Sequence, residues 1–390
     1  MNPPTISIIT PSFNQGQYLE ETIRSVIEQE GDFCIDYLIM DGGSTDNSVE
    51  IIRKYDDLIN RKKLPLNCRG ISLRWISEKD DGQADAINKG IQQTRGEILS
   101  YINSDDLYFP GAFGQVIKQF QSHPEYDFVY GDGDVIDEKG MLLWEWLSRP
   151  YDHAIIKSYH SLWNDFANYI MQQATFWRSS VHNKIGMFDK SLHYSMDLEF
   201  WVRGGAAGLS LIHIPVKLGK FRMIAGTKSL STPTVFWIDN MEIFRRYNGA
   251  SSMAKYFTYF YFNHAMNNGF DFNQVKNPEA KLFDRWRNLS SREICILRKK
   301  ASIGISRAMI LASIHLSGSV SQKQKADHFF LDAIRRHPIQ LFHPVAWGLV
   351  LRKVFGDKVG LQWQRIKQRL VNFYRNRRYL YRYLQKERPH

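Results

Sequence analysis

Residues 75–106, WISEKDDGQADAINKGIQQTRGEILSYINSDD, contain the pattern that decides the fold. The pattern predicts a strand, a loop, a helix and a second strand, which is the mostly apolar run of residues 98–102. Two adjacent carboxylates, Asp105 and Asp106, follow that strand. The carboxyl end of a strand is where open α/β sheets bind ligands, and two hard oxygen donors there suit Mg²⁺ or Mn²⁺ carrying a pyrophosphate. Taken alone, the same residues are typical of a solvated Asp-rich turn.

Two earlier segments repeat this arrangement. Residues 6–15, ISIITPSFNQ, predict a strand broken by Pro11 and then a helix with Asn14 as its N-cap. Residues 37–48, YLIMDGGSTDNS, predict a second buried strand that ends at Asp41 before a glycine pair and a helix. Strands that alternate with helices and end in polar loops predict an α/β fold with a mainly parallel, nucleotide-binding sheet.

Five segments, in this order along the chain, together resemble the family 2 inverting glycosyltransferases, which have the GT-A fold. They are TPSFNQ, DGGSTDNS, GQADAINKG, NSDD and QQATFWRSSVHNKIGMFDKSLHYSMDLEFWVR. The resemblance covers roughly residues 4–230. It implies a Rossmann-like nucleotide-diphospho-sugar transferase domain that passes a sugar to a hydroxyl of a glycan or a lipid-linked acceptor, with inversion at the anomeric carbon.

The organisation along the chain predicts more than one domain. A length of 390 residues is long for a single domain, and 43% hydrophobic residues support a substantial core. The pattern becomes wholly helical after about residue 235. We therefore expect a GT-A domain at 1–232, a helical C-terminal region at 233–350 and a basic amphipathic tail at 351–390.

The cysteines and the apolar segments indicate the cellular compartment of the protein. Three cysteines argue against a disulfide framework and favour a reducing compartment. The N-terminus MNPPTISIIT does not have the pattern of a signal peptide. The most apolar span, residues 302–320, contains Arg307 and five serines, which predicts a core helix and not a transmembrane one. These features predict a cytoplasmic protein.

Most of the positive charge lies at the C-terminus. Residues 352–390 contain twelve lysines and arginines and two acidic residues, which amounts to +10 of the chain's +11. Residues 352–388 either contact the inner face of an anionic membrane as an amphipathic helix or form a solvated helical end packed on their own domain. Nucleic acid is an unlikely partner because the chain has no recognised nucleic-acid-binding module.

The resemblance assigns the leaving diphosphate to the NSDD segment. Asp105 is the predicted ligand of Mn²⁺ or Mg²⁺, because a divalent cation offsets the charge of a departing nucleoside diphosphate. Asn103 stands at the first position of the family's Asp-x-Asp motif, where relatives often have Asp, so it binds metal through its carbonyl or contacts the sugar. Ser104 and Asp106 are assigned to donor binding; Asp106 alternatively supports Asp105 or is a charge before a helix.

The resemblance also assigns five nucleotide-binding residues. Asp41 is expected to accept hydrogen bonds from the base or the ribose, and its alternative role is to cap a turn. Pro11 and Asn14 are expected to line the nucleotide floor. Asp85 and Lys89 lie four residues apart on one helix and are expected near the nucleotide and sugar, with a surface ion pair of about 0.3–0.5 kcal/mol as the alternative.

Asp197 in YSMDLEFW is the predicted general base, because it matches the Asp of the family's Glu-Asp pair, in which Met196 replaces the Glu. Glu199 is the reserve candidate. Without the family pattern, Asp197 would be interpreted as a favourable charge at a helix N-terminus. Further candidates for acceptor or sugar contacts are Gln172, Gln173, Trp177 and Trp201.

The departures from the family pattern support a second hypothesis. Asn103 and Met196 replace acidic residues, and Ile224 stands where relatives often carry a His. A non-catalytic nucleotide-sugar-binding or assembly protein of a glycan pathway would show such changes. The retained acidic residues Asp41, Asp105 and Asp197 favour the enzyme.

Overall fold

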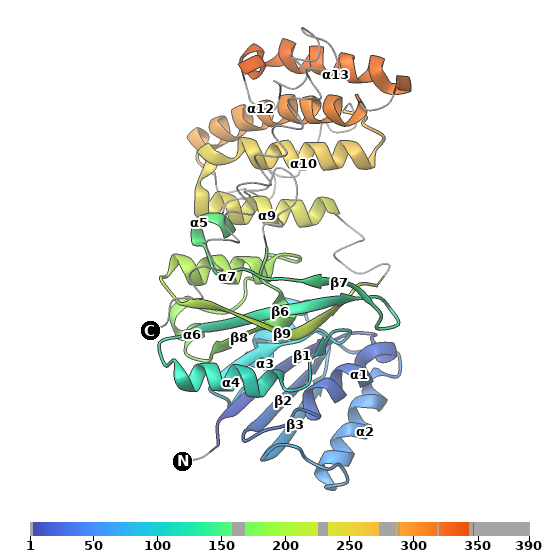
Figure 1. Ribbon diagram of the computed structural model, residues 1–390, viewed down its shortest axis with the longest axis vertical. Coiled ribbons are helices and arrows are strands. Elements are labelled where there is room, and N and C mark those ends of the chain that lie inside the picture. Colours follow the sequence, from blue (N-terminus) through green and yellow to red (C-terminus); the bar gives the residue numbers. More distant parts are fainter. Residues whose placement is uncertain are drawn as a thin grey trace, which may run out of the picture. The chain divides into compact units, whose positions relative to one another are not determined.

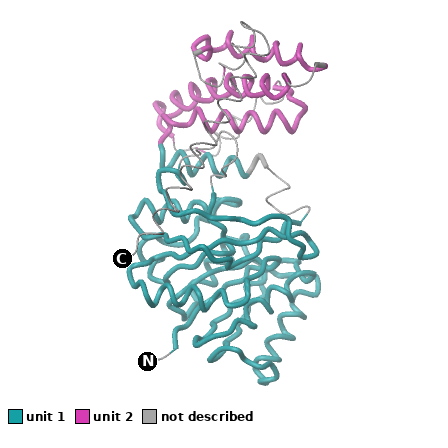
Figure 2. The backbone as a smooth tube through the Cα atoms, viewed as in Figure 1, with its two compact units in different colours: residues 1–248 teal, residues 249–390 magenta. Residues whose placement is uncertain are grey.

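The computed structural model describes residues 3–157, 168–224, 233–272, 286, 289–317, 320–342 and 346. The chain divides into two compact units, residues 1–248 and 249–390 (Figure 2). The helix α9 (Pro233–Asn248) belongs to the first unit, whereas the sequence placed a boundary after residue 232. The predicted basic tail, residues 351–390, lies outside the described residues.

A mixed sheet forms the centre of the first unit (Figure 1). In the described residues it has nine strands in the order β3-β2-β1-β4-β8-β6-β9-β5, with β7 paired to β6. The strands are β1 Thr5–Ser12, β2 Cys34–Asp41, β3 Gly70–Ser77, β4 Ile98–Tyr101, β5 Leu107–Tyr108, β6 Phe128–Ile136, β7 Leu142–Trp146, β8 Thr175–Arg178 and β9 Leu211–Arg222. The first four pair in parallel, and β8 joins them antiparallel to β4. β6 and β9 also pair in parallel, whereas β8 with β6, β7 with β6 and β5 with β9 pair antiparallel. The prediction of a mainly parallel sheet is therefore met by β1 to β4, and the rest of the sheet is mixed.

Helices cover both faces of the parallel strands. The helices α1 (Gly16–Ile27), α2 (Ser48–Asn60) and α4 (Ala112–Ser122) share one core cluster with Ile6 and Ile8 of β1. Ile9 faces the other way, because side chains alternate along a strand. It packs against α3 (Gln83–Ile91), where a Cβ on Gly90 would lie 2.6 Å from the Ile9 Cγ2. Glycine at position 90 therefore lets α3 lie close to β1.

Asn14 does not cap α1. The helix begins at Gly16, and its N-cap residue Gln15 makes no side-chain capping bond. Asn14 has a left-handed backbone (φ 50°), and its side-chain oxygen accepts a hydrogen bond from the Thr45 N–H at 2.8 Å. The cap prediction was wrong because this asparagine links two loops and does not start its own helix.

Four short elements complete the first unit, and successive helices build the second. The short elements are α5 His153–Ile156, the 3₁₀ turn η1 Gln172–Ala174, α6 Val181–Ile185 and α7 Met196–Ala206. The second unit contains η2 Ala250–Ser252, α10 Ala254–Asn267, α12 Ser291–Leu316, η4 Val320–Gln322, α13 Lys323–Arg336 and η5 Pro338–Phe342.

In the second unit, α12 packs against both α10 and α13. A capping box between Ser290 and Glu293 starts α12, and the glycine at position 304 allows its close contact with Phe257 of α10. Ile310 and Ala312 are fully buried, as expected for a core helix. Among the helices of the described residues, none combines the length and the apolar character that crossing a bilayer requires.

Candidate active site

The predicted nucleotide-binding residues meet at one edge of the sheet. Asp41 ends β2, Asn14 follows β1 and Asn103 follows β4, and the carboxyl ends of parallel strands share an edge. Hydrogen bonds join the loops there: the Asn14 N–H donates to the Ser44 Oγ at 2.8 Å, and the Ser77 Oγ donates to Asp41 at 2.7 Å. Segments far apart in the sequence therefore build one surface.

Asp41 is buried and accepts four hydrogen bonds. Its Oδ2 atom accepts from the N–H groups of Gly43 and Ser44 and from the Ser77 hydroxyl, whereas Oδ1 accepts from the Ser44 hydroxyl. Because a carboxylate oxygen has about two acceptor sites, Oδ1 is the atom that can take a further donor, such as a base N–H or a ribose hydroxyl.

An exposed aromatic residue near Asp41 was missed by the sequence analysis. A small pocket there is lined by Asp41, Glu78 and Lys89, among others. Phe13 is not one of the lining residues, but its ring lies 3.3 Å from the place that a Cβ on Gly42, the residue after Asp41, would take, and its side chain is 59% exposed. An exposed aromatic ring next to such a pocket can stack on a planar base. The sequence signal that could have identified Phe13 was its place as an aromatic residue between strand and helix in TPSFNQ. Pro11, a predicted site residue two positions earlier, pairs with Met40 inside β1.

Asp85 is the centre of an ion-pair cluster. It binds Lys190 at 3.0 Å and Lys89 at 3.1 Å, and Lys89 also lies 3.6 Å from Glu78. The hydrogen bond from Lys190, followed by that from Lys89, lowers the pKa of Asp85 to about 2. Asp85 is nearly buried, so this cluster is more than an isolated surface pair, and it fixes Lys89 beside the pocket.

Asn88 has a structural role on the same helix. Its side chain donates to the Phe188 carbonyl at 2.9 Å and accepts from the Phe188 N–H at 3.0 Å, joining α3 to the segment before α7. We expect Asn88→Ala to lower the free energy of unfolding by roughly 1–3 kcal/mol, because two buried backbone groups lose their partner. Chemical denaturation measures this loss. Gln93→Ala, which removes an exposed amide at the end of the helix, is the control and should change stability by less than about 0.5 kcal/mol.

Asp106 stabilises the NSDD loop, residues 103–106, through hydrogen bonds to its carboxylate. It is fully buried and accepts hydrogen bonds from Gln173 Nε2 at 2.7 Å, Asn103 Nδ2 at 3.0 Å and the Arg222 N–H at 2.8 Å. Burial raises the pKa of its carboxyl group well above the ordinary value. Asn103 in turn accepts from Gln83 at 2.5 Å. Asn103 and Asp106 therefore brace the loop through each other.

The carboxylate of Asp105 is free for a ligand. In the described part of the chain it accepts a hydrogen bond only from its own backbone, although the charge of Arg222 acts on it. Arg222 is itself buried; its Nε donates to the Asp105 carbonyl and its Nη2 to Glu21. Partial burial raises the pKa of Asp105. Ser104, between Asn103 and Asp105 in the same loop, is buried.

Asp197 lies in the first turn of α7 and close to the same loop. Asn168 Nδ2 donates to its Oδ2 at 2.9 Å, and the Leu198 N–H also stabilises the carboxylate. Burial nevertheless raises the pKa of Asp197 to about 6. Burial, followed by the negative charges of Asp197 and Asp106, raises the pKa of Tyr101 at the end of β4. Both carboxylates therefore act on one tyrosine, although they are far apart in the sequence.

Four other candidates serve the fold. Glu199 is buried in an ion pair with Arg203 at 2.9 Å and accepts from the Tyr247 hydroxyl, so it does not reach a substrate. Gln172 donates to the Tyr101 carbonyl at 2.6 Å. Trp177 and Trp201 are completely buried in an aromatic cluster, so they belong to the core and offer no face to an acceptor or a sugar.

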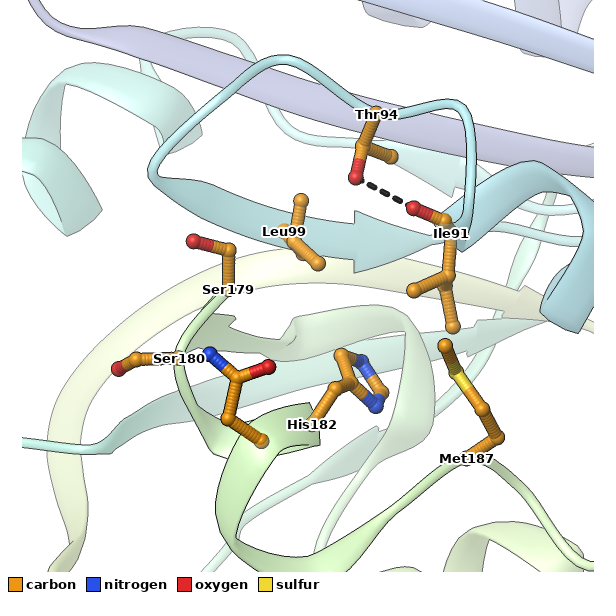
Figure 3. Close-up of a pocket in the computed structure, with 8 residues that line it drawn as sticks. Ile91, Thr94, Leu99, Ser179, Ser180, His182 and Met187 are labelled. Carbon is orange, nitrogen blue, oxygen red and sulfur yellow. Dashed lines mark hydrogen bonds between the residues drawn. The ribbon is translucent and has the colours of Figure 1, made fainter.

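A second hollow, of about 310 Å³, lies near the opposite end of β4 (Figure 3). Its lining includes Thr94, Leu99 and His182 and has no acidic or basic residue other than that histidine. The imidazole of His182 accepts from Trp177 Nε1 and donates to the Gly186 carbonyl, and burial lowers its pKa. A neutral, fully hydrogen-bonded histidine gives this hollow no charge for a diphosphate.

Comparison with known proteins agrees with the geometry. The family described as glycosyl transferase family 2 matches residues 7–190, a range that includes the predicted donor-binding and metal-binding residues but not Asp197, Glu199 or Trp201. An uncharacterized glycosyltransferase of Rickettsia typhi is 28% identical over 207 residues, which cover 51% of this chain and 58% of the relative. One of Methanocaldococcus jannaschii is 24% identical over 204 residues, covering 52% and 65%. The matches thus span less than two thirds of either relative.

The crystal structure of S. aureus TarS superposes with a TM-score of 0.50 at 15% sequence identity. The match covers 85% of this chain and 54% of that one. At this identity the likeness concerns the fold, which is the α/β sheet domain with a C-terminal helical region that the sequence predicted.

Proposed function

Since residues 7–190 belong to glycosyl transferase family 2, we propose that the chain moves a sugar from a nucleotide-diphosphate donor to a hydroxyl of a glycan or lipid-linked acceptor. The observation that carries this proposal is the pair of carboxylates around the end of β4. Among the described residues, no other residue donates a hydrogen bond to the Asp105 carboxylate, and Asp197 has a pKa raised to about 6. The transfer needs these two features: a carboxylate that holds a cation beside the leaving diphosphate, and a base that takes the proton of the acceptor hydroxyl.

The donor's nucleotide would occupy the edge formed by β1 to β3. The ring of Phe13 would stack on the base beside Asp41, and Lys89 would face the phosphates from α3. The Asp85 cluster holds Lys89 in place for that contact. Pro11 and Asn14 contribute by shaping the loop.

Asp105 is the residue that would hold Mg²⁺ or Mn²⁺. In the described residues no group of three or more His, Cys, Asp or Glu side chains could hold a metal ion. Mg²⁺ in phosphate-transfer sites is commonly held by one or two carboxylates and by the substrate phosphates, so a single available carboxylate fits it. When bound, the cation would offset the charge of the leaving diphosphate. Asn103 would be a weak second ligand, because its neutral carbonyl oxygen already accepts a hydrogen bond from Gln83.

Asp197 would take the proton from the acceptor hydroxyl. Asn168 Nδ2 holds the Oδ2 atom and so orients the carboxylate for the acceptor hydroxyl. Removal of the proton lets the hydroxyl oxygen displace the nucleoside diphosphate in one step, and that step inverts the anomeric configuration.

The acidic limb of the pH profile should report Asp197. Because its pKa is raised to about 6, we expect kcat/KM to increase with pH through about 6 and then level off. Asn168→Ala should move this limb to higher pH, since the amide stabilises the ionised carboxylate. Initial rates at constant ionic strength measure both profiles. An unchanged limb in the variant would mean that Asn168 does not act on the base.

The direct test is a panel of UDP-, GDP- and dTDP-sugars with Mn²⁺ or Mg²⁺, assayed for nucleoside diphosphate release with and without lipid-linked acceptors. We expect release from one donor and faster release with an acceptor. If a donor binds but no nucleoside diphosphate is released from it under any of these conditions, the proposal is contradicted and the protein is a non-catalytic nucleotide-sugar binder.

A further inference from the structure

The strand β7 exposes an unusual run of apolar side chains. All but one of the residues 141–147, MLLWEWL, are apolar, and we refer to them as the apolar strand. The exposed fractions are 66% for Met141, 55% for Leu142, 47% for Leu143, 46% for Trp144 and 66% for Leu147. Single exposed apolar residues are ordinary, but a contiguous run of this kind indicates a surface that contacts something apolar.

Both faces of the apolar strand are exposed. The pairing with β6 shifts register between Val135 and Ile136, so Trp144 lies opposite Val135 and Leu142 opposite Ile136. Because adjacent residues of β6 face opposite ways, Trp144 and Leu142 lie on opposite faces. Within the described residues, β7 pairs only with β6. The carboxylate in the run, Glu145, is neutralised by an ion pair with Lys217 at 2.5 Å. A protein partner packed on one face would leave the other in water, whereas lipid surrounds both.

The apolar strand runs along the proposed active site. Before it, the Glu138 carbonyl accepts from Arg222 Nη1 at 3.0 Å, and Arg222 also binds the backbone of Asp105. At its other end, Trp146 Nε1 donates to the Tyr169 carbonyl at 3.2 Å. Tyr169 follows Asn168, which holds the proposed base. A bilayer at β7 would therefore lie beside both the donor and the acceptor ends of the site.

We propose that the apolar strand inserts into the surface of an anionic lipid bilayer and that the sugar acceptor is anchored in that bilayer. The second half of this proposal rests on the proposed transferase function. Tryptophan beside aliphatic residues is typical of the membrane–water interface. The sequence adds the charge that an anionic surface attracts, because residues 352–390 carry +10.

Sedimentation with sucrose-loaded vesicles tests the insertion without requiring catalysis. The full chain is mixed with vesicles of phosphatidylcholine alone or with phosphatidylglycerol. We expect binding to the anionic vesicles and a fall of at least about tenfold in the partition coefficient of the triple variant Leu142→Ser, Leu143→Ser, Leu147→Ser. The matched control is Leu331→Ser, Ile339→Ser, Leu341→Ser, which removes three exposed apolar side chains from the second unit and should bind as the wild type does.

Two further readouts locate the contact. Brominated lipids should quench the fluorescence of the wild type more than that of Trp144→Phe. Release of nucleoside diphosphate from a soluble donor should be equal in the strand variant and the wild type, whereas transfer to a vesicle-borne acceptor should fall with vesicle binding.

Three results would overturn the proposal. If the strand variant binds vesicles as well as the wild type, the apolar strand does not insert. If no form binds vesicles but the strand variant alone loses a dimer in sedimentation velocity, the strand pairs with a second copy. If a water-soluble acceptor is used as fast as a vesicle-borne one, the acceptor is not membrane-anchored. Vesicle binding without any nucleoside diphosphate release would instead refute the transferase function and leave the insertion standing.

Discussion

Asp197→Asn should lower kcat by about 10²–10⁴-fold, which is the usual contribution of a general base. The asparagine has nearly the same shape and can still accept the hydrogen bond from Asn168, but it cannot take a proton. Binding of the nucleoside diphosphate should stay unchanged, because Asp197 serves the acceptor. The measurement is the rate of acceptor-dependent transfer at saturating donor, together with the dissociation constant of the nucleotide.

The stability of this variant should not decrease. Burial raises the pKa of Asp197 above its unfolded value, so at neutral pH the ionised carboxyl destabilises the folded state, and the substitution removes that charge. The matched control is Glu50→Gln, which removes an exposed acidic residue from the first turn of α2 and should leave the rate unchanged. A loss of activity accompanied by a lower melting temperature would indicate a structural role for Asp197.

Asp105→Asn should abolish the effect of the metal. We expect a fall in kcat of about 10²–10³-fold, typical for the loss of one group that stabilises charge in the transition state. Nucleoside diphosphate should bind the wild type more tightly with Mn²⁺ than with a chelator, and the variant should bind it equally under both conditions. Titration calorimetry measures this difference.

The control for Asp105→Asn is Asp57→Asn, at an exposed carboxylate on α2 that pairs with Arg61. It should behave as the wild type does. Metal-dependent binding that persists in Asp105→Asn would contradict the assignment of Asp105 as the ligand. Asp106 is unsuitable for this comparison, because its three hydrogen bonds support the loop and its removal would disturb the fold.

The sequence predicted the elements whose pattern is local. The apolar runs of β1 and β2 and the helical spacing of α1 follow from residues a few positions apart. Asp41 and Asn103 follow the two strands, β2 and β4, that flank β1. The order of the family segments supplied the rest of the site, including Asp197.

The sequence could not reveal features that depend on distant residues. The GDGD segment at 131–134 has a turn composition, yet it lies inside β6; a Cβ on Gly131 or Gly133 would collide with the backbone of β9 at Val216 or Gly219. Those glycines permit close strand packing and do not make a turn. The environment of each carboxylate is equally non-local: Asp85 pairs with Lys190, 105 residues away, while the Asp105 carboxylate accepts from no other residue in the described part of the chain.

Nucleoside diphosphate release, measured side by side for wild type, Asp105→Asn and Asp197→Asn with one donor, metal and acceptor, tests the central claim most directly. The account predicts that the wild type turns over, that both variants lose at least about 10²-fold and that both retain their fold. Wild-type release that either substitution leaves unchanged would contradict a transferase site formed by these two carboxylates.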